Sequence, residues 1–452
     1  MNKYKKIAIL FIILVFTAAA AGINHDNDQK NEKVRTRLDP GQFRTIGFYS
    51  ALRTSHQEYA SDRIVVKFKP MISEQAAAAV VQATDSQIIK KISQLNIFII
   101  KTPQETPVEE MLYTFEHNPD VEYAELDYKT HITITPNDIL FEYQYSLSNQ
   151  GQAIGIPGSP QGKNSADIKA TAGWEETKGL EEVIIAIIDT GVDLKHPDLI
   201  NKLYSDGYDF VNDDDEADDD HGHGTHVAGI AAAETDNNEG IAGVAWNCKI
   251  IPVKVMDAEG EGYYSWMISG IDYAVQQGAD VINLSLGGDV DSANLKNILK
   301  AAYENDVFVV ASAGNDNNPV LYPAAYDEYC LAVAASDYDD LRPEWSNFGP
   351  EVDVAAPGVR ILSCVPTWFW GPGSLPYAFS TGTSMAAPHA AGLAALIKGI
   401  KNWLSPSDIL NIIRYTSDDI NQGEHPGKDD YIGFGRINME KALVPIKITG
   451  GN

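Results

Sequence analysis

The sequence predicts an α/β fold with a doubly wound, mainly parallel sheet, preceded by a small α+β unit. After Thr135, short apolar runs rich in Val, Ile and Ala alternate with helical stretches at 264–277 and 295–305. This alternation is typical of parallel strands joined by crossover helices that cover both faces of a sheet. The expected strands of the sheet are 183–188, 250–255, 281–286, 307–311 and 331–335.

A different and shorter pattern precedes the sheet. Strand-like runs and two helical stretches alternate before residue 128, which suits a small ferredoxin-like α+β unit. The expected strands are 63–68, 97–101 and 121–125, and the expected helices are 73–83 and 108–117. Residues 23–61 are polar and lack sustained periodicity, so they are expected to form a flexible lead-in.

Residues 1–22 have the pattern of a secretory signal peptide. A basic start is followed by an apolar run from Ile7 to Phe16 and then by small residues up to Gly22. A membrane anchor is the alternative, but the run is short for crossing a bilayer. No cysteine follows the run, which argues against a lipoprotein, and no later segment is apolar enough to span a membrane. The protein is therefore expected to be secreted and extracellular.

The charge of the chain excludes one large class of partner. The 452 residues include 34 Lys and Arg against 63 Asp and Glu, a formal net charge of −29. Nothing basic is clustered to neutralise phosphates, so no nucleic-acid partner is expected, whereas bound cations are favoured. Cys248, Cys330 and Cys364 are an odd count and too few for a disulfide scaffold, and they are expected to be buried, inert thiols.

Three blocks far apart in the chain carry the residue types of a nucleophilic catalytic unit: Ile187 to Val192, His223 to Gly229 and Gly382 to Pro388. Asp189 closes a β-branched run and precedes Thr-Gly, which indicates a buried strand ending in a turn. His223 and Ser384 precede small, helix-compatible residues, with Pro388 tolerable in a first turn, so both are expected at helix N-termini. In such a unit the serine attacks, the histidine is its base and the aspartate orients the base.

With these blocks, in the order Asp, His, Ser, the chain resembles the subtilisin-like serine proteases, or subtilases, and most closely their thermitase-like branch. Aspartic proteases also contain Asp-Thr-Gly, but the second motif for their paired carboxylates is missing here. The resemblance runs from about Ser61 to about Leu443 and implies a peptidase domain at 132–452. It also implies an inhibitory propeptide at 62–131 that assists folding and fills the cleft until it is removed. A permanent regulatory domain is the alternative for that segment.

Three neighbouring histidines compete for the role of the base. In the family's His-Gly-Thr-His motif the first histidine is the base, which assigns His223. It leaves His226 as a packed helix residue and His221 as a solvated one. A zinc site formed with the aspartates at 218–220 is the alternative, but a His-Glu-x-x-His motif is missing and the glycines leave the loop poorly preorganised.

The resemblance also implies an oxyanion donor and substrate-binding edges. Asn315 matches the family's oxyanion asparagine, with the backbone N–H of Ser384 as the second donor; the alternative is an ordinary turn asparagine. Extended backbone edges would pair with the peptide and line the primary specificity pocket. The residues assigned to them are Gly260, Ser285, Leu286, Gly287, Ser312, Ala313 and Gly314. No charged residue can be placed at the pocket floor, so broad specificity favouring apolar or aromatic side chains is expected.

The segment 368–373, Trp-Phe-Trp-Gly-Pro-Gly, departs from the family pattern and lengthens the connection before Ser384. Exposed aromatic side chains are common at binding surfaces. This segment could therefore extend the cleft, or its rings could simply pack within their own loop. The sequence leaves both interpretations open.

Calcium is the cofactor that the resemblance implies. Its tight site would take side-chain oxygens and backbone carbonyls from distant loops, as suits a hard cation with many ligands. The side chains are those of Asp138, Asp198 and Asn237, and the carbonyls are those of Thr235, Glu239 and Ile241. A second, weaker site would use Asp209, Asp214 and Asp218, for which a solvated acidic loop is the alternative. Neither pattern is an EF-hand.

The sequence thus predicts a secreted, calcium-dependent serine endopeptidase, made as a self-processing precursor that acts on protein or peptide substrates as a monomer. Its own propeptide is the expected intramolecular inhibitor. A second enzyme hypothesis is a dedicated maturation protease for one partner. A hypothesis of another class is a catalytically silent homologue that acts as a binding module, which the intact chemical positions disfavour.

Overall fold

A computed structural model describes residues 59–104, 106–128, 134–155, 159–205, 207–369 and 374–444. Contacts divide the chain into two units, one of residues 50–132 and a larger one that includes residues 133–452. The expected signal peptide, most of the lead-in and the residues near the expected propeptide boundary lie outside the described residues. A strand begins at Tyr59, so the lead-in ends slightly earlier than expected.

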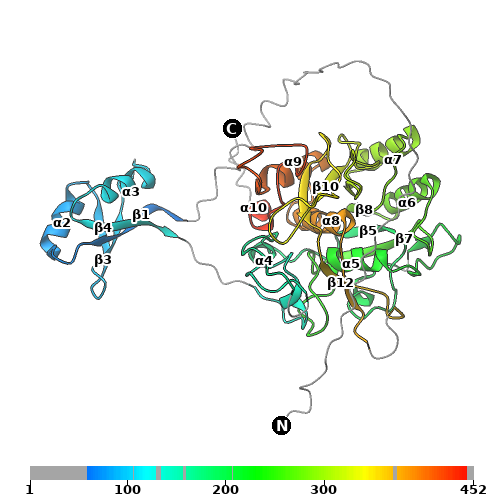
Figure 1. The fold of residues 1–452 in the computed structure, drawn as a ribbon, viewed down its shortest axis with the longest axis horizontal. Coiled ribbons are helices and arrows are strands. Elements are labelled where there is room, and N and C mark those ends of the chain that lie inside the picture. Colours follow the sequence, from blue (N-terminus) through cyan, green and yellow to red (C-terminus); the bar gives the residue numbers. More distant parts are fainter. Residues whose placement is uncertain are drawn as a thin grey trace, which may run out of the picture. The chain divides into compact units, whose positions relative to one another are not determined.

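The N-terminal unit has the expected ferredoxin-like arrangement (Figure 1). Its antiparallel sheet has the strand order β2-β3-β1-β4. The elements are β1 (Tyr59–Phe68), α2 (Glu74–Gln82), β2 (Gln87–Ile92), β3 (Ile97–Lys101), α3 (Val108–Glu116) and β4 (Val121–Tyr128). Alternate residues of β1, Ile64, Val66 and Phe68, are buried with apolar residues of both helices. One face of the sheet and the two helices therefore form a small core of their own.

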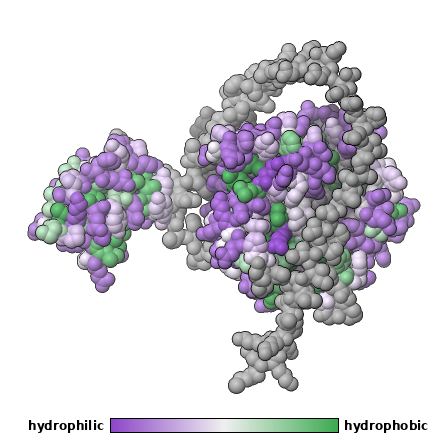
Figure 2. All heavy atoms as spheres, in the orientation of Figure 1, coloured by the Kyte–Doolittle hydropathy of each residue, from purple (hydrophilic) through white to green (hydrophobic). Residues whose placement is uncertain are grey.

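Strand β2 is the element of this unit that sequence patterning missed. It lies at the edge of the sheet, and its side chains are mostly exposed, Ile89 by 52%. Apolar residues also reach the surface of this unit in the space-filling view (Figure 2). An exposed edge strand lacks the alternation of buried and exposed residues on which strand prediction depends.

The larger unit is built on a parallel sheet with the strand order β11-β10-β9-β8-β5-β7-β6. This confirms the predicted doubly wound α/β fold. The strands are β5 (Ile184–Asp189), β6 (Tyr208–Asp209), β7 (Lys249–Lys254), β8 (Val281–Leu284), β9 (Phe308–Ser312), β10 (Leu331–Ser336) and β11 (Val354–Pro357). A separate hairpin consists of β12 (Ile361–Cys364) and β13 (Tyr377–Ser380).

Helices pack on both faces of this sheet (Figure 1). Helices α6 (Tyr264–Gln276) and α7 (Ala293–Glu304) share a core with Ile184, Ala186 and Ile188 of β5. Helices α5 (His223–Ala232) and α8 (Thr383–Ile400) pack on each other and on the strands. The remaining helical elements are α4 (Ala170–Glu176), α9 (Pro406–Thr416), α10 (Met439–Leu443) and the 3-10 turns η1 (Phe141–Tyr143) and η2 (Ile200–Lys202).

The carboxyl ends of the central strands bring the three sequence blocks together. Asp189 is the last residue of β5, and the segments after β8 and β9 contain Ser285 and Asn315. Helices α5 and α8 begin at His223 and Thr383. Ligand sites of open α/β sheets lie at this edge, outside the carboxyl ends of the strands. The fold therefore predicts a site there before any side chain is considered.

Candidate active site

Asp189 and His223 form a hydrogen-bonded pair. Nδ1 of His223 lies 2.7 Å from Oδ1 of Asp189, which also accepts a bond of 2.8 Å from the backbone N–H of Thr190. Asp189 is fully buried, and the side chain of His223 is about one quarter exposed, by 26%. Burial opposes charging of the imidazole, but the charge and hydrogen bond of Asp189 outweigh it, so the pKa of His223 is raised. The pair therefore stabilises an imidazolium.

A second buried carboxylate, Asp219, holds the backbone around this pair. Its Oδ1 accepts hydrogen bonds from the hydroxyl of Thr190 and from the N–H groups of His221 and Gly222, and its Oδ2 accepts from the N–H and hydroxyl of Thr225. The carboxylate thus joins the turn after β5 to the first turn of α5. Burial raises the pKa of Asp219, and these donors oppose the rise. Sequence analysis missed this residue because it lies within an acidic run.

Ser384 is the second residue of α8, so its backbone N–H has no partner within the helix. Its hydroxyl donates to the carbonyl of Ser285 at 3.0 Å, and the hydroxyl of Ser285 donates to the carbonyl of Ser384 at 2.8 Å. Pro388 lies in the interior of α8, so its placement in a first turn was wrong. Proline has no N–H to bond the carbonyl four residues earlier, and Ser285 supplies the missing donor to that carbonyl.

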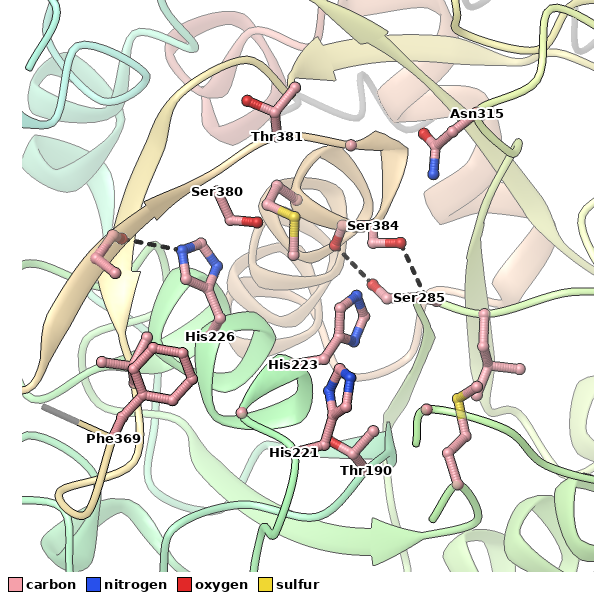
Figure 3. A pocket seen from close by; sticks show the side chains of 18 of the residues that line it. Thr190, His221, His223, His226, Ser285, Asn315, Phe369, Ser380, Thr381 and Ser384 are labelled. Carbon is pink, nitrogen blue, oxygen red and sulfur yellow. Dashed lines mark hydrogen bonds between the residues drawn. The ribbon is translucent and has the colours of Figure 1, made fainter. Parts of the chain in front are cut away.

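Asn315 is oriented by the residue before Ser384. Its Oδ1 accepts hydrogen bonds from the N–H of Thr383 at 2.8 Å and from the hydroxyl of Thr383 at 3.0 Å. A backbone N–H can only donate, so these bonds fix which end of the amide is the oxygen. The Nδ2 group of Asn315 consequently points toward Ser384 and the cavity (Figure 3).

One cleft of about 360 Å³ contains His223, Ser384 and Asn315 (Figure 3). Of the predicted substrate-binding residues, Gly260, Ser285 and Leu286 line it. Gly287, Ser312, Ala313 and Gly314 follow the same strand ends but are not among its lining residues. Phe369, from the aromatic segment that could extend the cleft, lines it as well. Sequence patterning did not identify the other apolar lining residues, which are Met256, Val365, Ala378, Phe379 and Met385.

The other two histidines also line the cleft. His226 is buried, as expected; its Nε2 lies 3.1 Å from the carbonyl oxygen of Ala378, and burial lowers its pKa to about 3. His221 is only half-buried, and its ring packs beside Gly260, so it is less solvated than expected. Within the described ranges, no cluster of three or more His, Cys, Asp or Glu side chains is arranged to hold a metal ion, and a zinc site gains no support.

The structure brings together the side chains predicted for the tight calcium site. Nδ2 of Asn237 donates to Oδ1 of Asp198 at 2.9 Å, and the N–H of Ile241 donates to Oδ2 of Asp198 at 3.0 Å. Asp138 accepts from the N–H of Asp236 through both oxygens. Burial raises the pKa of Asp138 to about 6, with a further contribution from the charge of Asp198. Buried carboxylates are thus held close together on joined loops.

The residues predicted for the weaker cation site line one shallow hollow. Asp209, Asp214 and Asp218 lie there with other acidic residues. Lys254, which sequence analysis missed, also lines it; its side chain is 1% exposed, and its ammonium donates to Asp220 and to the carbonyl of Thr190. A buried cation therefore already balances part of the negative charge of this hollow.

Cys248, Cys330 and Cys364 are buried and unbridged, which confirms their predicted burial. Burial raises the pKa of all three thiols, that of Cys248 to about 11. A protonated, buried thiol is a poor nucleophile.

Within the part of the chain that the structure describes, no helix is long and apolar enough to span a membrane.

Comparison with known proteins agrees with this geometry. The model of the subtilase family matches residues 181–435, and that of the fervidolysin N-terminal prodomain matches residues 50–127. A thermophilic serine proteinase of a Bacillus strain is 37% identical over 403 residues, which cover 87% of this chain and 90% of that protein. Thermitase of Thermoactinomyces vulgaris is 42% identical over 276 residues, 61% of this chain and 93% of thermitase.

A solved structure gives the same result. A protease of Pseudoalteromonas arctica matches with a TM-score of 0.61 and 32% identity, covering 69% of this chain and 100% of that one. The match to the family model extends over more than half of the chain and includes all three sequence blocks. The chain is a thermitase-like serine endopeptidase with an N-terminal prodomain, and it belongs to the subtilase family.

Proposed function

We propose that the protein hydrolyses peptide bonds through a catalytic unit of Asp189, His223 and Ser384. The observation that carries the proposal is the bond of 2.7 Å between His223 and Asp189 in the cleft that also contains Ser384. A sulfonyl fluoride directed at reactive serines should modify Ser384 and abolish hydrolysis of denatured casein. Modification of another serine, with hydrolysis intact, would reject the assignment.

The reaction begins with a change of hydrogen-bond partner. The hydroxyl of Ser384 now donates to the carbonyl of Ser285, and rotation about its Cα–Cβ bond would turn it toward Nε2 of His223. Such bonds often form only when substrate is bound. His223 takes the proton as Ser384 attacks the carbonyl carbon, and it then gives the proton to the leaving amine. Asp189 keeps the proton of Nδ1 in place and stabilises the imidazolium.

Negative charge develops on the substrate's carbonyl oxygen during the attack. Two donors are available beside Ser384: Nδ2 of Asn315, oriented by Thr383, and the N–H of Ser384 at the start of α8. Both are fixed before substrate arrives, so little reorganisation is needed as the charge forms. The positive end of the α8 dipole acts in the same direction.

Replacing Asn315 tests the oxyanion role. Asn315→Ala should lower kcat by about 10²- to 10³-fold, with a smaller change in KM, because the lost donor acts mainly in the transition state. The measurement is steady-state hydrolysis of a peptide anilide. Asn317→Ala, in the same loop, is the matched control and should keep nearly full activity. A tenfold or smaller loss in the first variant would show that Asn315 is an ordinary turn residue.

The substrate is proposed to lie along the backbone near Gly260 and Ser285 as an added strand, with an apolar or aromatic side chain before the scissile bond. The apolar lining of the cleft supports this preference. Hydrolysis of denatured casein at many sites would support broad specificity. A dedicated maturation protease would scarcely cut casein, and a strong preference for Lys or Arg would contradict the apolar pocket.

The N-terminal unit is proposed to be a propeptide, ending near residue 131, that inhibits the enzyme until self-cleavage removes it. The matched prodomain model and the separate ferredoxin-like core support this proposal. The mature enzyme is proposed to be secreted and to act as a monomer. Relatives named as extracellular and as cell wall-associated proteases support a location outside the cell.

Calcium is the proposed cofactor, and the residues around Asp138 and Asp198 fit it best. Carboxylate, amide and carbonyl oxygens gathered from three loops are suitable ligands for calcium. A cation would also offset the burial and mutual repulsion that raise the pKa of Asp138. Bound calcium would tie the segment before η1 to the loop before η2 and to the loop after α5. Asp209, Asp214 and Asp218 are proposed as a weaker site, because Lys254 competes with a cation there.

Removing calcium should lower the melting temperature by several degrees. A ligand of the native state at about 100 times its Kd contributes about 2.7 kcal/mol to stability. The measurement is thermal unfolding of the Ser384→Ala variant, to prevent self-digestion, with excess EDTA. Adding calcium beyond the EDTA should restore the original value, and magnesium should not. An unchanged melting temperature in EDTA would contradict the proposed site.

A further inference from the structure

We propose that Phe369 forms the wall of an apolar subsite for the leaving group, so that the enzyme prefers a bulky apolar residue directly after the scissile bond. This inference rests on the proposed function and adds a substrate preference to it. It uses the described part of the aromatic segment that departs from the family pattern. The sequence could not decide whether that segment extends the cleft or packs within itself.

Ser384 and His223 divide the lining of the cleft into two sides, which we call its arms: Asn315 lies on one side and Phe369 on the other (Figure 3). One arm is lined by Gly260, Ser285 and Leu286, the residues proposed to bind the acyl side of the substrate. In the close-up view, Phe369 lies on the opposite side of the Ser384–His223 pair from Asn315 (Figure 3). The second arm therefore contains Phe369 and its neighbours.

The chemistry assigns the second arm to the leaving group. The carbonyl oxygen under attack must face Nδ2 of Asn315 and the N–H of Ser384. The chain before the scissile bond then follows the edge near Ser285. The leaving nitrogen must lie next to His223, which protonates it, and the residue that carries this nitrogen continues away from Asn315. That direction leads to Phe369.

Hydrogen bonds made by Thr367, Trp368 and Phe369 hold the segment that forms this wall. The N–H of Thr367 donates to Oδ2 of the buried Asp193 at 2.7 Å, and Nε1 of Trp368 donates to the carbonyl of Asp219 at 3.1 Å. The N–H of Phe369 donates to the carbonyl of Pro366 at 2.9 Å. Asp219 is also the anchor of α5, so the wall and His223 are attached to the same structure. The wall is therefore formed before substrate binds.

The ring of Phe369 lies beside a glycine. The Phe369 ring approaches to 3.6 Å the position that a Cβ atom of Gly222 would occupy, and Gly222 precedes His223 at the start of α5. The ring thus lies against bare backbone beside the catalytic histidine. A side chain at Gly222 would also be strained, because its φ is +108°.

The lining of this arm selects for apolar side chains. Val365, Ala378 and Phe379 line the cleft with Phe369, and Val365 is buried. Glu259, the carboxylate that lines the cleft, is next to Gly260 in the other arm. His226 is buried, and its low pKa keeps it neutral. A charged side chain entering here would lose hydration without gaining a partner of opposite charge.

Acyl transfer to amines measures binding to this arm separately from binding to the rest of the cleft. The enzyme, freed of its propeptide, is acylated at Ser384 with N-acetyl-phenylalanine methyl ester, and amino-acid amides compete with water for the acyl group. The amine nitrogen attacks the ester carbonyl and the bond to Ser384 Oγ breaks. The proton from nitrogen passes through His223 to that oxygen. The ratio of peptide product to hydrolysis then reports binding of the amine alone.

Leucine and phenylalanine amides should give at least about tenfold more transfer than glycine or aspartate amides, the scale of one apolar contact in a specificity pocket. Phe369→Ala should remove most of this preference, and Phe369→Leu should retain it. Leu375→Ala is the matched control, since Leu375 is an exposed apolar residue of the same connection that does not line the cleft. It should behave as the wild type does.

Each outcome has a separate meaning. Equal transfer to glycine and leucine amides by the wild type would overturn the subsite, as would a preference that survives in Phe369→Ala with normal ester hydrolysis. Absence of ester hydrolysis in the wild type would instead contradict the proposed function. Phe369→Lys provides a second test if the alanine variant does not fold, because it should shift the preference toward aspartate amide; no shift would also overturn the proposal.

Discussion

Ser384→Ala is expected to lower kcat for peptide hydrolysis by about 10⁶-fold, the scale observed when the nucleophile of such a unit is removed. The reason is that Ser384 lies at the start of α8 in the cleft that contains His223 and Asn315, where rotation of its side chain would bring the hydroxyl to His223. The fold and the free energy of unfolding should change little, because the substitution removes a single hydrogen bond, from the hydroxyl of Ser384 to the carbonyl of Ser285. The measurement is single-turnover hydrolysis of a peptide anilide.

Ser265→Ala is the control for this result, because Ser265 is exposed on α6 away from the cleft lining. It should retain wild-type activity and wild-type melting temperature. If Ser384→Ala kept more than about one thousandth of wild-type kcat while correctly folded, catalysis by Ser384 as a covalent nucleophile would be rejected.

Asp189→Asn should have the next largest effect, a loss of kcat on the order of 10⁴-fold. The amide can donate a hydrogen bond where the carboxylate only accepts, so it favours the imidazole tautomer that cannot take the proton of Ser384. Because Asp189 raises the pKa of His223, its removal should also lower that pKa. The acidic limb of the remaining activity should then move to lower pH.

The pH profile of kcat/KM for Asp189→Asn checks the second part of this expectation, since its acidic limb reports the base of the free enzyme. Asp272→Asn, a change of the same type on the exposed surface of α6, should leave both the rate and the limb unchanged. An acidic limb that stayed in place or moved upward in Asp189→Asn would mean that Asp189 does not set the pKa of His223.

Much of this architecture could be predicted because it depends on local patterns. The strands β5, β7, β8, β9 and β10 are rich in apolar residues and almost entirely buried, as expected of strands covered on both faces. Asp189, His223 and Asn315 then follow from their positions at the ends of strands and the starts of helices. The short hairpin of β12 and β13 carries no such pattern, and it was not predicted.

Sequence patterns do not identify residues whose roles depend on contacts with distant parts of the chain. Asp219 is one of several adjacent aspartates, and only the fold shows that it alone is buried between β5 and α5. Lys254 continues a strand pattern, and its partners lie on other segments. Pro388 was placed in a first turn because the sequence does not show the donor that replaces its missing N–H. That donor is the hydroxyl of Ser285, which comes from a distant loop and bonds the carbonyl of Ser384 inside α8.

Self-processing by Ser384 can be followed by intact-mass spectrometry of the purified precursor with calcium, wild type beside Ser384→Ala. The wild type is expected to lose its N-terminal segment by cleavage between Tyr128 and Ile134, whereas Ser384→Ala should stay whole. That result would establish the nucleophile, the propeptide and the start of the mature enzyme together. Cleavage of the variant at the same place and rate, or a wild type that remains whole and inactive, would contradict self-processing by Ser384.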